Sequence, residues 1–510
     1  MEWKTYQIPA LFARFIPKRP ANIRGLKGSR VAADARHRAY SGAESNNLTF
    51  SWAATEHTAD QVIYNDLESL RGRSREQVRN NSHARKFVKL VGDNVIGHMG
   101  ITMQASVKSS AGAMNKRVNG NLERHWRNWG MRGNCDITGK LSWIDIQTLE
   151  IKGWASDGEM IVRKHRTGQY GFQLELIDPV LLDVRHNQDL GGGSKIRMGI
   201  EVDQSGRPVA YWLSSPNSQA INGYTYQQDR LRVDASEIFH SFLPELVNQS
   251  RGLPQMATAL LRLNMLEGYS EAALVNAREG ASNMRYFTSP DGGETMPADG
   301  IDANGDPFMD AAEPGSQRVL PPGYGVENYD PAYPNGEIAD FNKLMLREIA
   351  AGLGVDYVGL SGDLEGVNYS SIRAGVLETR EAWKGLQKFM IDHFMRPIFE
   401  DWLHEALIMR ALTNPNGSGT LELMSEMQYR DVTWQGRRWA WVDPLKDMAA
   451  NELAIKMGIT TPSRVIRETG NDPEEVLAEY AEDVAKFAAV GVSLTGENDI
   501  MEDDTDAEED

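Results

Sequence analysis

The stretch ADFNKLMLREIAAGLGVDYVGLSGDLEGVNYSSIRAG, residues 339–375, contains the two changes of pattern that decide the fold. Up to residue 353, apolar residues recur at the three- and four-residue spacing of a helix: Ile338, Phe341, Met345 and Ile349. A glycine-rich break then runs from 352 to 368. Helical spacing returns beyond it and predicts a long helix from 373 to about 411, with Pro397 as a kink or an end.

A second long helix is expected upstream. Residues 256–285 are rich in helix formers and low in breakers apart from Gly268 and Gly280. Between Thr288 and Gly336, glycine, proline and aspartate are dense, and neither a helical nor a strand period continues. The sequence therefore predicts two helices that flank a loop-rich insertion or a small β-like unit.

The rest of the chain predicts an α+β fold that is mainly α-helical. Residues 56–104 predict helix and then a strand, 142–154 a helix, and 159–164 and 172–176 strands. Residues 200–213 predict a β-hairpin, because the turn residues 203–206 lie between β-rich flanks. Thr461 and Asp472 each stand before a proline suited to a first helical turn. Helices are therefore expected near 444–457, 462–469 and 473–490.

Charge is unevenly distributed along the chain. The formal net charge of −17 argues against a protein that grips phosphates over its whole surface, although it leaves loose passage of DNA open. The first 38 residues are basic and the end, ENDIMEDDTDAEED, is acidic, so both predict poorly ordered arms. The densest basic run predicts a solvated helix face, with a DNA contact as the alternative: Arg71, Arg73, Arg75, Arg79, Arg85, Lys86 and Lys89.

Neither a membrane nor an exported location is expected. No window approaches the run of about 18 apolar residues that a bilayer span needs, and the first 20 residues lack a signal-peptide core. The expected compartment is the cytoplasm. The single cysteine, Cys135, cannot form an intrachain disulfide and is expected to be a small, half-buried residue.

The local sequence motifs for phosphate, zinc and calcium binding are incomplete in this chain. Residues 133–141 have the wrong glycine spacing for a phosphate loop, and Leu141 stands where a hydroxyl is needed. His404 and Glu405 begin a zinc motif that lacks its second histidine. Five residues match a calcium-loop template, but its glycine position is Pro307, so an acidic surface loop is favoured over a metal site: Asp302, Asn304, Asp306, Asp310 and Glu313. No catalytic residue, cofactor or metal is therefore expected.

Four stretches resemble one known family when they are taken in order. They are Arg38–Tyr40 with NSHARKFVKLVGDNVIG (81–97), His240 with RGLP (251–254), residues 339–375, and WQGRRWAWVDPLKDMAA (434–450). Together they resemble the portal proteins of lambda-type tailed bacteriophages, over about residues 38–490. The region 288–336 contains no motif that aligns with the family.

The resemblance implies a portal fold with wing, stem, clip and crown, assembled as a ring of typically twelve copies. Its implied parts are a basic N-terminal arm (1–38), an α+β wing (39–255), a first stem helix (256–287), a clip (288–336), a second stem helix (337–353), a channel loop (354–372), a long helix with a return to the wing (373–442), crown helices (443–490) and an acidic disordered tail (491–510).

The same resemblance implies the role and the partners. The ring would occupy the capsid portal vertex of the virion after assembly in the host cytoplasm, and double-stranded DNA would pass through it without sequence-specific contacts. Implied partners are other copies of the chain, the terminase large subunit, the major capsid and scaffolding proteins, and head-completion or adaptor proteins. Another capsid or neck protein, or an enzyme with an unrecognised site, remains the alternative.

Three groups of residues are the expected functional positions. The channel-loop group is Gly354, Gly359, Ser361, Gly362, Asp363, Glu365, Gly366 and Asn368. Arg373 and Arg380 are expected at the lumen or a subunit interface. The expected terminase-docking group in the clip is Asp302, Asp306, Asp310 and Glu313. The glycines would let the loop change conformation, although an ordinary long connection explains them equally well.

Overall fold

The computed structural model of the chain describes residues 56–109, 112–216, 226–281, 285–288, 325–328, 337–365, 369–414, 419–439, 444–469, 471 and 473–489. The chain divides into the units Met1–His57 and Thr58–Asp510, and all helices and strands given below belong to the second. The expected N-terminal arm, the acidic tail and most of the predicted clip lie outside the described residues.

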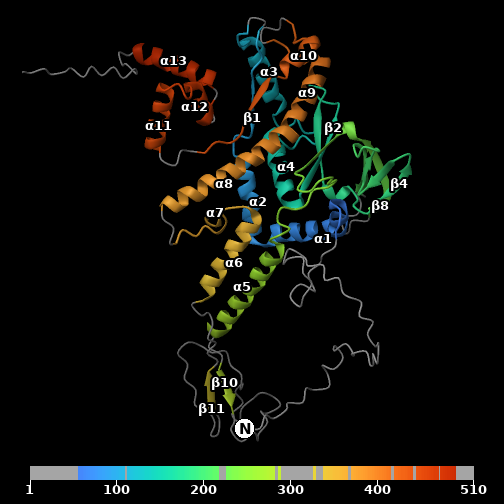
Figure 1. The fold of residues 1–510 in the computed structure, drawn as a ribbon, viewed down its shortest axis with the longest axis vertical. Coiled ribbons are helices and arrows are strands. Elements are labelled where there is room, and N and C mark those ends of the chain that lie inside the picture. The colour runs from blue at the N-terminus through green and yellow to red at the C-terminus, as the bar shows by residue number, and fades with distance from the viewer. Residues whose placement is uncertain are drawn as a thin grey trace, which may run out of the picture. The chain divides into compact units, whose positions relative to one another are not determined.

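Two helices open the described chain where the sequence predicted helix (Figure 1). Thr58 caps α1 (Ala59–Asn80) in a capping box with Gln61, so the backbone donors of the first turn are satisfied. Asn81 ends α1 and caps α2 (Ser82–Val95) by accepting from the backbone N–H groups of His83 and Ala84. The strand β1 (Thr102–Ala105) follows and pairs antiparallel with β12 (Val432–Gln435), which brings distant parts of the chain together.

Two antiparallel sheets follow within the described residues. The order of the three-stranded sheet is β3 (Gln173–Ile177), β2 (Glu159–His165) and β9 (Ile238–Phe242). The five-stranded sheet runs in chain order: β4 (Gln188–Gly191), β5 (Ser194–Arg197), β6 (Ile200–Val202), β7 (Pro208–Pro216) and β8 (Tyr226–Asp234). β6 and β7 are the two arms of the hairpin predicted over 200–213, which is therefore confirmed.

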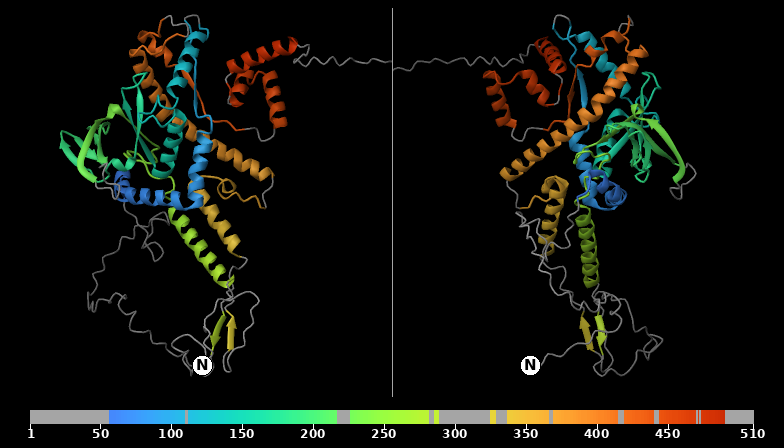
Figure 2. Two further views of the ribbon diagram at one scale, coloured as in Figure 1. Left: turned by 180° about the vertical axis from the view of Figure 1, so that it is seen from behind. Right: turned by 45° about the vertical axis from the view of Figure 1, so that its right-hand side comes forward.

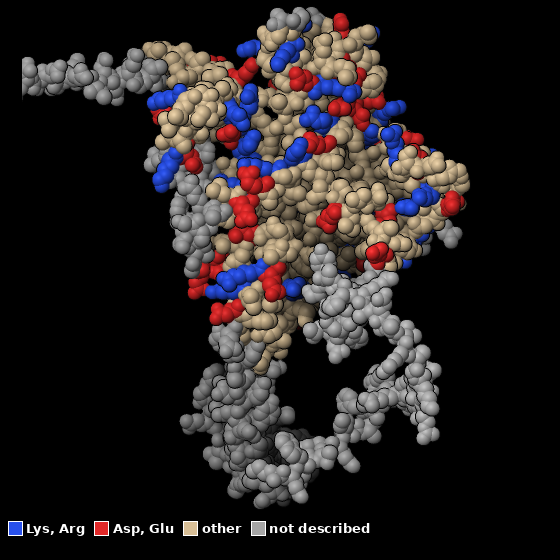
Figure 3. Space-filling model, viewed as in Figure 1, with Lys and Arg blue, Asp and Glu red and all other residues tan. Residues whose placement is uncertain are grey.

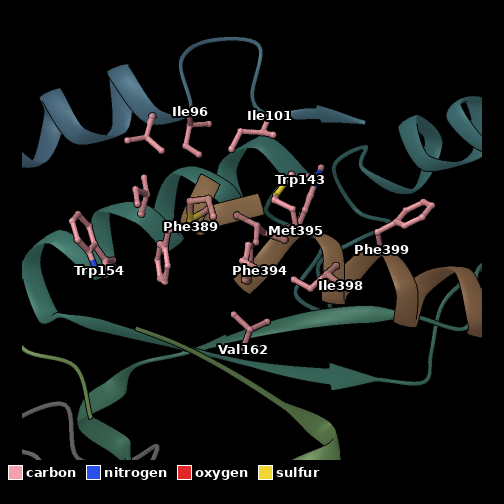
Figure 4. Packing of buried hydrophobic residues seen from close by; sticks show 14 of the residues in the cluster. Ile96, Ile101, Trp143, Trp154, Val162, Phe389, Phe394, Met395, Ile398 and Phe399 are labelled. Atoms are coloured by element: carbon pink, nitrogen blue, oxygen red, sulfur yellow. The ribbon is translucent and has the colours of Figure 1, made fainter. Parts of the chain in front are cut away.

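A core rich in aromatic residues packs helices onto the three-stranded sheet. It includes α3 (Lys116–Trp129), α4 (Trp143–Asp157) and α9 (Arg396–Ile408). The rings of Trp126 and Trp129 stack with centroids 4.7 Å apart, and Trp402 meets Trp126 edge-on at 5.0 Å. Figure 4 shows Val162 of β2 pointing toward side chains of α4, α9 and the segment before α9.

The predicted long helix from 373 to 411 changes its winding near the proline. It consists of α8 (Tyr369–Met390), a π-helical segment (Ile391–Met395) and α9, which contains Pro397 in its first turn. Proline has no backbone N–H and its ring clashes with the carbonyl four residues earlier, here His393. The wider π segment accommodates that clash, so the chain continues as helix instead of ending.

Helices α5 (Leu260–Ala281) and α6 (Glu337–Leu353) occupy the positions predicted for the two helices around the insertion. Between them the strands β10 (Arg285–Thr288) and β11 (Gly325–Asn328) pair antiparallel. The predicted C-terminal helices are also present: α11 (Pro444–Lys456), α12 (Pro462–Thr469) and α13 (Pro473–Ala489). None of the helices in the described part of the chain combines the length and the apolar composition that a bilayer span requires.

The connection predicted as a loop over 354–372 is only partly a loop. It contains the short helix α7 (Tyr357–Ser361), which Asp356 caps by accepting from the Gly359 N–H. Gly362 then ends α7 with φ +78°, a conformation that favours glycine. Helix α8 begins at Tyr369, four residues earlier than the glycine-rich pattern indicated.

Candidate functional site

The first candidate region is the antiparallel pair α5 and α6, which lie side by side in both views of Figure 2. Thr258, just before α5, donates its hydroxyl to Gly352 O at 2.8 Å. One turn further along α5, Arg262 Nε donates to Glu348 Oε2 at 2.8 Å. Further again, the rings of Tyr269 and Phe341 meet edge-on at 5.1 Å. These contacts fix the register of the pair, and the β10–β11 ladder continues in the same antiparallel sense.

The second region is the connection from α6 through α7 to α8, where the channel-loop residues were predicted. Lys343 on α6 places Nζ 2.5 Å from Glu365 Oε2. Tyr357 donates its hydroxyl to Asp363 Oδ2 at 2.8 Å, and the Arg347 guanidinium lies 5.3 Å from the centroid of the Tyr357 ring. The structure thus pairs Asp363 and Glu365 with α6 and α7 side chains.

These contacts also shift the pKa values of Asp363 and Lys343. The backbone N–H of Glu365 and the hydroxyl of Tyr357 donate to Asp363, and together they lower the pKa of that carboxyl. Glu365 raises the pKa of Lys343 in turn. Asp363 and Lys343 therefore stay charged at neutral pH, and the connection is held to α6 by electrostatic and hydrogen-bond contacts.

The remaining predicted residues are distributed as follows. Gly354 has φ +66° directly after α6, and Ser361 donates its hydroxyl to Tyr357 O at the end of α7. Arg373 belongs to the beginning of α8, but its side chain lies outside the described part. Arg380 lies in the middle of α8 with its guanidinium 5.8 Å from the Trp439 ring centroid. Six predicted residues lie outside the described residues: Asp302, Asp306, Asp310, Glu313, Gly366 and Asn368.

A buried charge cluster, which we call the Glu159 cluster, is a feature that the sequence did not identify as a unit. Glu159 begins β2 and is fully buried. Its carboxylate accepts from Arg251 on the segment before α5, from Arg71 on α1 and from His240 on β9, at 2.5, 2.5 and 3.0 Å. Burial alone would raise the pKa of Glu159, but Arg251 and Arg71 outweigh it and hold the pKa well below its usual range.

The backbone segments beside the Glu159 cluster pack so closely that two glycines have no room for a Cβ atom. Gly158 has φ +87°, and a Cβ at this position would lie 2.1 Å from the Leu253 carbonyl carbon. A Cβ on Gly252 would lie 2.0 Å from the Gly158 oxygen. The motif His240 with Arg251–Pro254 is therefore explained as a set of contacts with Gly158 and Glu159. The quoted motif was the only sequence signal for this cluster, because Arg71 and Glu159 carry no local pattern.

Two residues of the basic run contradict the prediction of a solvated face. Arg71 is buried in the Glu159 cluster, and Arg75 forms ion pairs with Asp157 and Asp178 at 2.7 and 2.6 Å. The run spans several helical turns, so part of it necessarily faces inward. Arg73, Arg79, Arg85 and Lys89 are exposed as expected. Figure 3 shows that acidic and basic side chains are interspersed on the face that it displays.

The described residues do not bring the incomplete sequence motifs together into a metal site. No group of three or more metal-ligating side chains occurs among them. Residues 133–139 form turns in which Asp136 accepts from the backbone N–H groups of Lys140 and Leu141, so this segment is the plain turn that was expected. Burial raises the pKa of the Cys135 thiol to about 12, which disfavours a reactive thiolate.

Comparison with known proteins gives one family. A family model described as "Phage portal protein, lambda family" matches residues 45–387. A "Probable portal protein" of Halomonas phage phiHAP-1 is 33% identical over 465 residues, which cover 89% of this chain and 88% of the relative. The "Portal protein" of Escherichia phage N15 and "Portal protein B" of Escherichia phage lambda are 23% and 22% identical, each over 87% of this chain and 88% of the relative.

Solved structures give weaker similarities. The neck of an empty gene transfer agent particle, computed with C6 symmetry, has a TM-score of 0.41 and 15% identity, covering 79% of this chain and 93% of that chain. The neck of a native particle, computed with C12 symmetry, has a TM-score of 0.39 and 14% identity, covering 78% and 94%. TM-scores of this size are too low to establish a shared fold.

Proposed function

Because the chain belongs to the lambda family of phage portal proteins, we propose that it forms a dodecameric ring at the unique capsid vertex. Terminase would package double-stranded DNA through this ring, and the DNA would leave through it during ejection. Head-completion and tail proteins would assemble on it, and the major capsid and scaffolding proteins would surround it. The ring itself would be a structural component of the virion without enzymatic activity.

The observation that carries the proposal beyond family membership is the antiparallel pair α5 and α6. Its register is set by the contacts Arg262–Glu348 and Tyr269–Phe341, and β10 and β11, which lie between the two helices in sequence, pair antiparallel. We assign α5 and α6 to the stem and the region 288–336 to the clip. Two paired helices on either side of an insertion favour a portal over another capsid or neck protein.

The other parts follow from the same assignment. Residues up to 255 would form the wing, and 373–442 the long helix with its return to the wing. Residues 354–372 would form the channel loop, and the helices α11, α12 and α13 the crown. Asp363 and Glu365, which α6 and Tyr357 hold in place, would then be the charged residues nearest to passing DNA.

A ring needs a surface on each subunit that fits a different surface of the next. Helix α5 carries an exposed apolar strip, in which Leu261 is 70% and Met265 64% exposed, and it continues past Gly268 and Ala272 to Val275. The spacing of three and four residues is that of a helix–helix seam. We propose that this strip contacts a neighbouring copy in the ring.

Negative-stain imaging with mass determination of the particles tests the ring. Wild-type protein is expected as rings of about a dozen subunits with a central channel. Met265→Glu should abolish them, whereas the matched variant Met424→Glu, at a residue that is 95% exposed outside α5, should keep them. A stable monomer or dimer at high concentration would overturn the ring. Rings that tolerate Met265→Glu would overturn only the contact through α5.

A further inference from the structure

Three segments that are far apart in sequence meet beside the middle of α8. They are the end of α2, residues 380–387 of α8, and residues 436–439 after β12. Gln387 Nε2 donates to Val95 O at 3.2 Å and to Arg437 O at 3.0 Å. A Cβ on Gly436 would lie 2.7 Å from the Gln387 side chain, so only glycine fits there without displacement. These contacts fix the position of the backbone that carries Arg437 and Trp439.

Two arginines meet at the ring of Trp439. Arg437 Nη1 donates to Asn94 Oδ1 at 3.1 Å and also to Asp93 O, and Trp439 Nε1 donates to the same Asn94 oxygen at 3.1 Å. The guanidinium carbons of Arg380 and Arg437 lie 5.8 and 6.0 Å from the centroid of the Trp439 ring. Both distances are within the range of a cation–π contact. Two positive charges therefore share one aromatic ring.

Within the part of the chain that the structure describes, neither Arg380 nor Arg437 forms an ion pair with a carboxylate, and Asp447 acts on Arg380 only by its charge. Among described residues up to 439, the hydrogen-bond partners of Arg437 are neutral oxygens. Arg380 Nε is buried and has no hydrogen-bond partner there. Burial, and then the charge of Arg437, lower the pKa of Arg380, and Asp447 only partly opposes them. By contrast, the half-buried Arg430 meets Glu426 at 2.6 Å and Glu400 at 3.2 Å.

We propose that Arg380 and Arg437, held on Trp439, bind a phosphate group. A guanidinium presents a planar fork of N–H donors that matches the oxygens of a phosphate. The Nε donor of Arg380 has no hydrogen-bond partner among the described residues. A partly desolvated pair of like charges is unfavourable by itself, and an anion between them removes that cost. The phosphate comes from a nucleic-acid backbone or from free inorganic phosphate.

Thermal unfolding of the assembled protein tests the site with inorganic phosphate at constant ionic strength. Phosphate should raise the Tm of the wild type with increasing concentration, because a ligand of the folded state stabilises it. Arg380→Gln should lose this rise. Arg438→Gln, an exposed neighbour of Arg437 in sequence, should keep it. Arg380→Gln is the primary variant because Arg437 also supports Asn94 and its loss can affect folding.

A labelled 20-base-pair duplex distinguishes the two sources of phosphate. Fluorescence anisotropy over a range of salt concentrations gives the slope of log K against log salt, which should fall by about one for Arg380→Gln if the site contacts a DNA backbone. An unchanged slope together with a lost phosphate effect assigns the site to free phosphate. The DNA-binding measurement rests on the proposed function. Imaging of the same samples shows whether rings form, so a failure of the ring can be told apart from a failure of the phosphate site.

Two results would overturn the proposal. One is a wild-type Tm that does not respond to phosphate, or that responds equally in Arg380→Gln. The other concerns the acidic residues Asp443 and Asp447 that follow in sequence. In this second result, Asp443→Asn or Asp447→Asn lowers the Tm as much as Arg380→Gln does, while phosphate has no effect on the wild type. That combination would show that the two arginines pair with these aspartates and do not bind phosphate.

Discussion

The guanidinium of Arg251 and the carboxylate of Glu159 lie 2.5 Å apart, Nη2 to Oε1, and both side chains are completely buried. Arg251 stands shortly before α5, and Glu159 is the first residue of β2. Arg251 also donates to Leu182 O and Met198 O, so one side chain joins the three-stranded sheet, the five-stranded sheet and the approach to α5. All four residues of the Glu159 cluster lie within the predicted wing (39–255), and the cluster fixes the segment that leads from the wing into α5.

Replacing the acid at the centre of this cluster should be costly. Glu159→Gln leaves Arg71 and Arg251 buried without a counter-charge, and the loss of one partner of a buried pair costs about 3–5 kcal/mol. The matched variant Glu68→Gln removes an exposed partner of Arg185 and should change the free energy of unfolding far less, because water screens that ion pair. Urea unfolding measures both. Equal effects would show that the buried charges are not important for stability.

Glycine at 158 should be irreplaceable for two reasons. Gly158→Ala forces a positive φ on alanine and places its Cβ against the Leu253 backbone, so a loss of several kcal/mol is expected, on the order of 3. Gly72→Ala is the control, because this helical position has nothing within 4 Å and alanine should stabilise α1 by up to about 1 kcal/mol. Thermal unfolding of the two variants should therefore shift in opposite directions.

Glu150 should make stability depend on pH near neutrality. It lies fully buried on α4, and burial raises its pKa from 4.5 to about 8, which the nearby Ser241 hydroxyl opposes without outweighing. A raised folded-state pKa gives stability that is complete below about pH 4.5 and is lost as the pH rises through about 8, by about 1.4 kcal/mol per pH unit. Urea midpoints at pH 5 to 8 should fall less steeply for Glu150→Gln. Parallel curves would contradict this assignment.

Tyr357 should hold the connection after α7 in place. Tyr357→Phe removes the hydrogen bond from the Tyr357 hydroxyl to the Asp363 carboxylate, which links α7 to the segment after it. Amide hydrogen exchange in residues 361–365 should therefore become at least about tenfold faster, with little change in the core. Tyr480→Phe, at an exposed tyrosine on α13, should leave exchange in 361–365 unchanged. No change in Tyr357→Phe would mean that Lys343 alone holds the segment.

Much of the secondary structure follows from local sequence. The helices α5, α6, α12 and α13 and the hairpin of β6 and β7 were predictable because periodicity, prolines and turn residues act within a few residues of each other. The π segment before Pro397 was not predictable, because a proline permits either an end or an altered winding. The short helix α7 was missed because its glycines masked the Asp356 cap.

The residues of the candidate sites also fall into those that the sequence identified and those that only the tertiary structure brought together. The sequence by itself identified the family motifs, the connection that carries Asp363 and Glu365, and the absence of a complete local catalytic motif. Only the tertiary structure decided that Arg71, Glu159, His240 and Arg251 form one buried cluster, and that Arg380 and Arg437 meet at Trp439. Periodicity reports which face of an element is apolar. It does not report which charged residues from distant elements will be brought together, because burial and pairing are settled only when those elements pack.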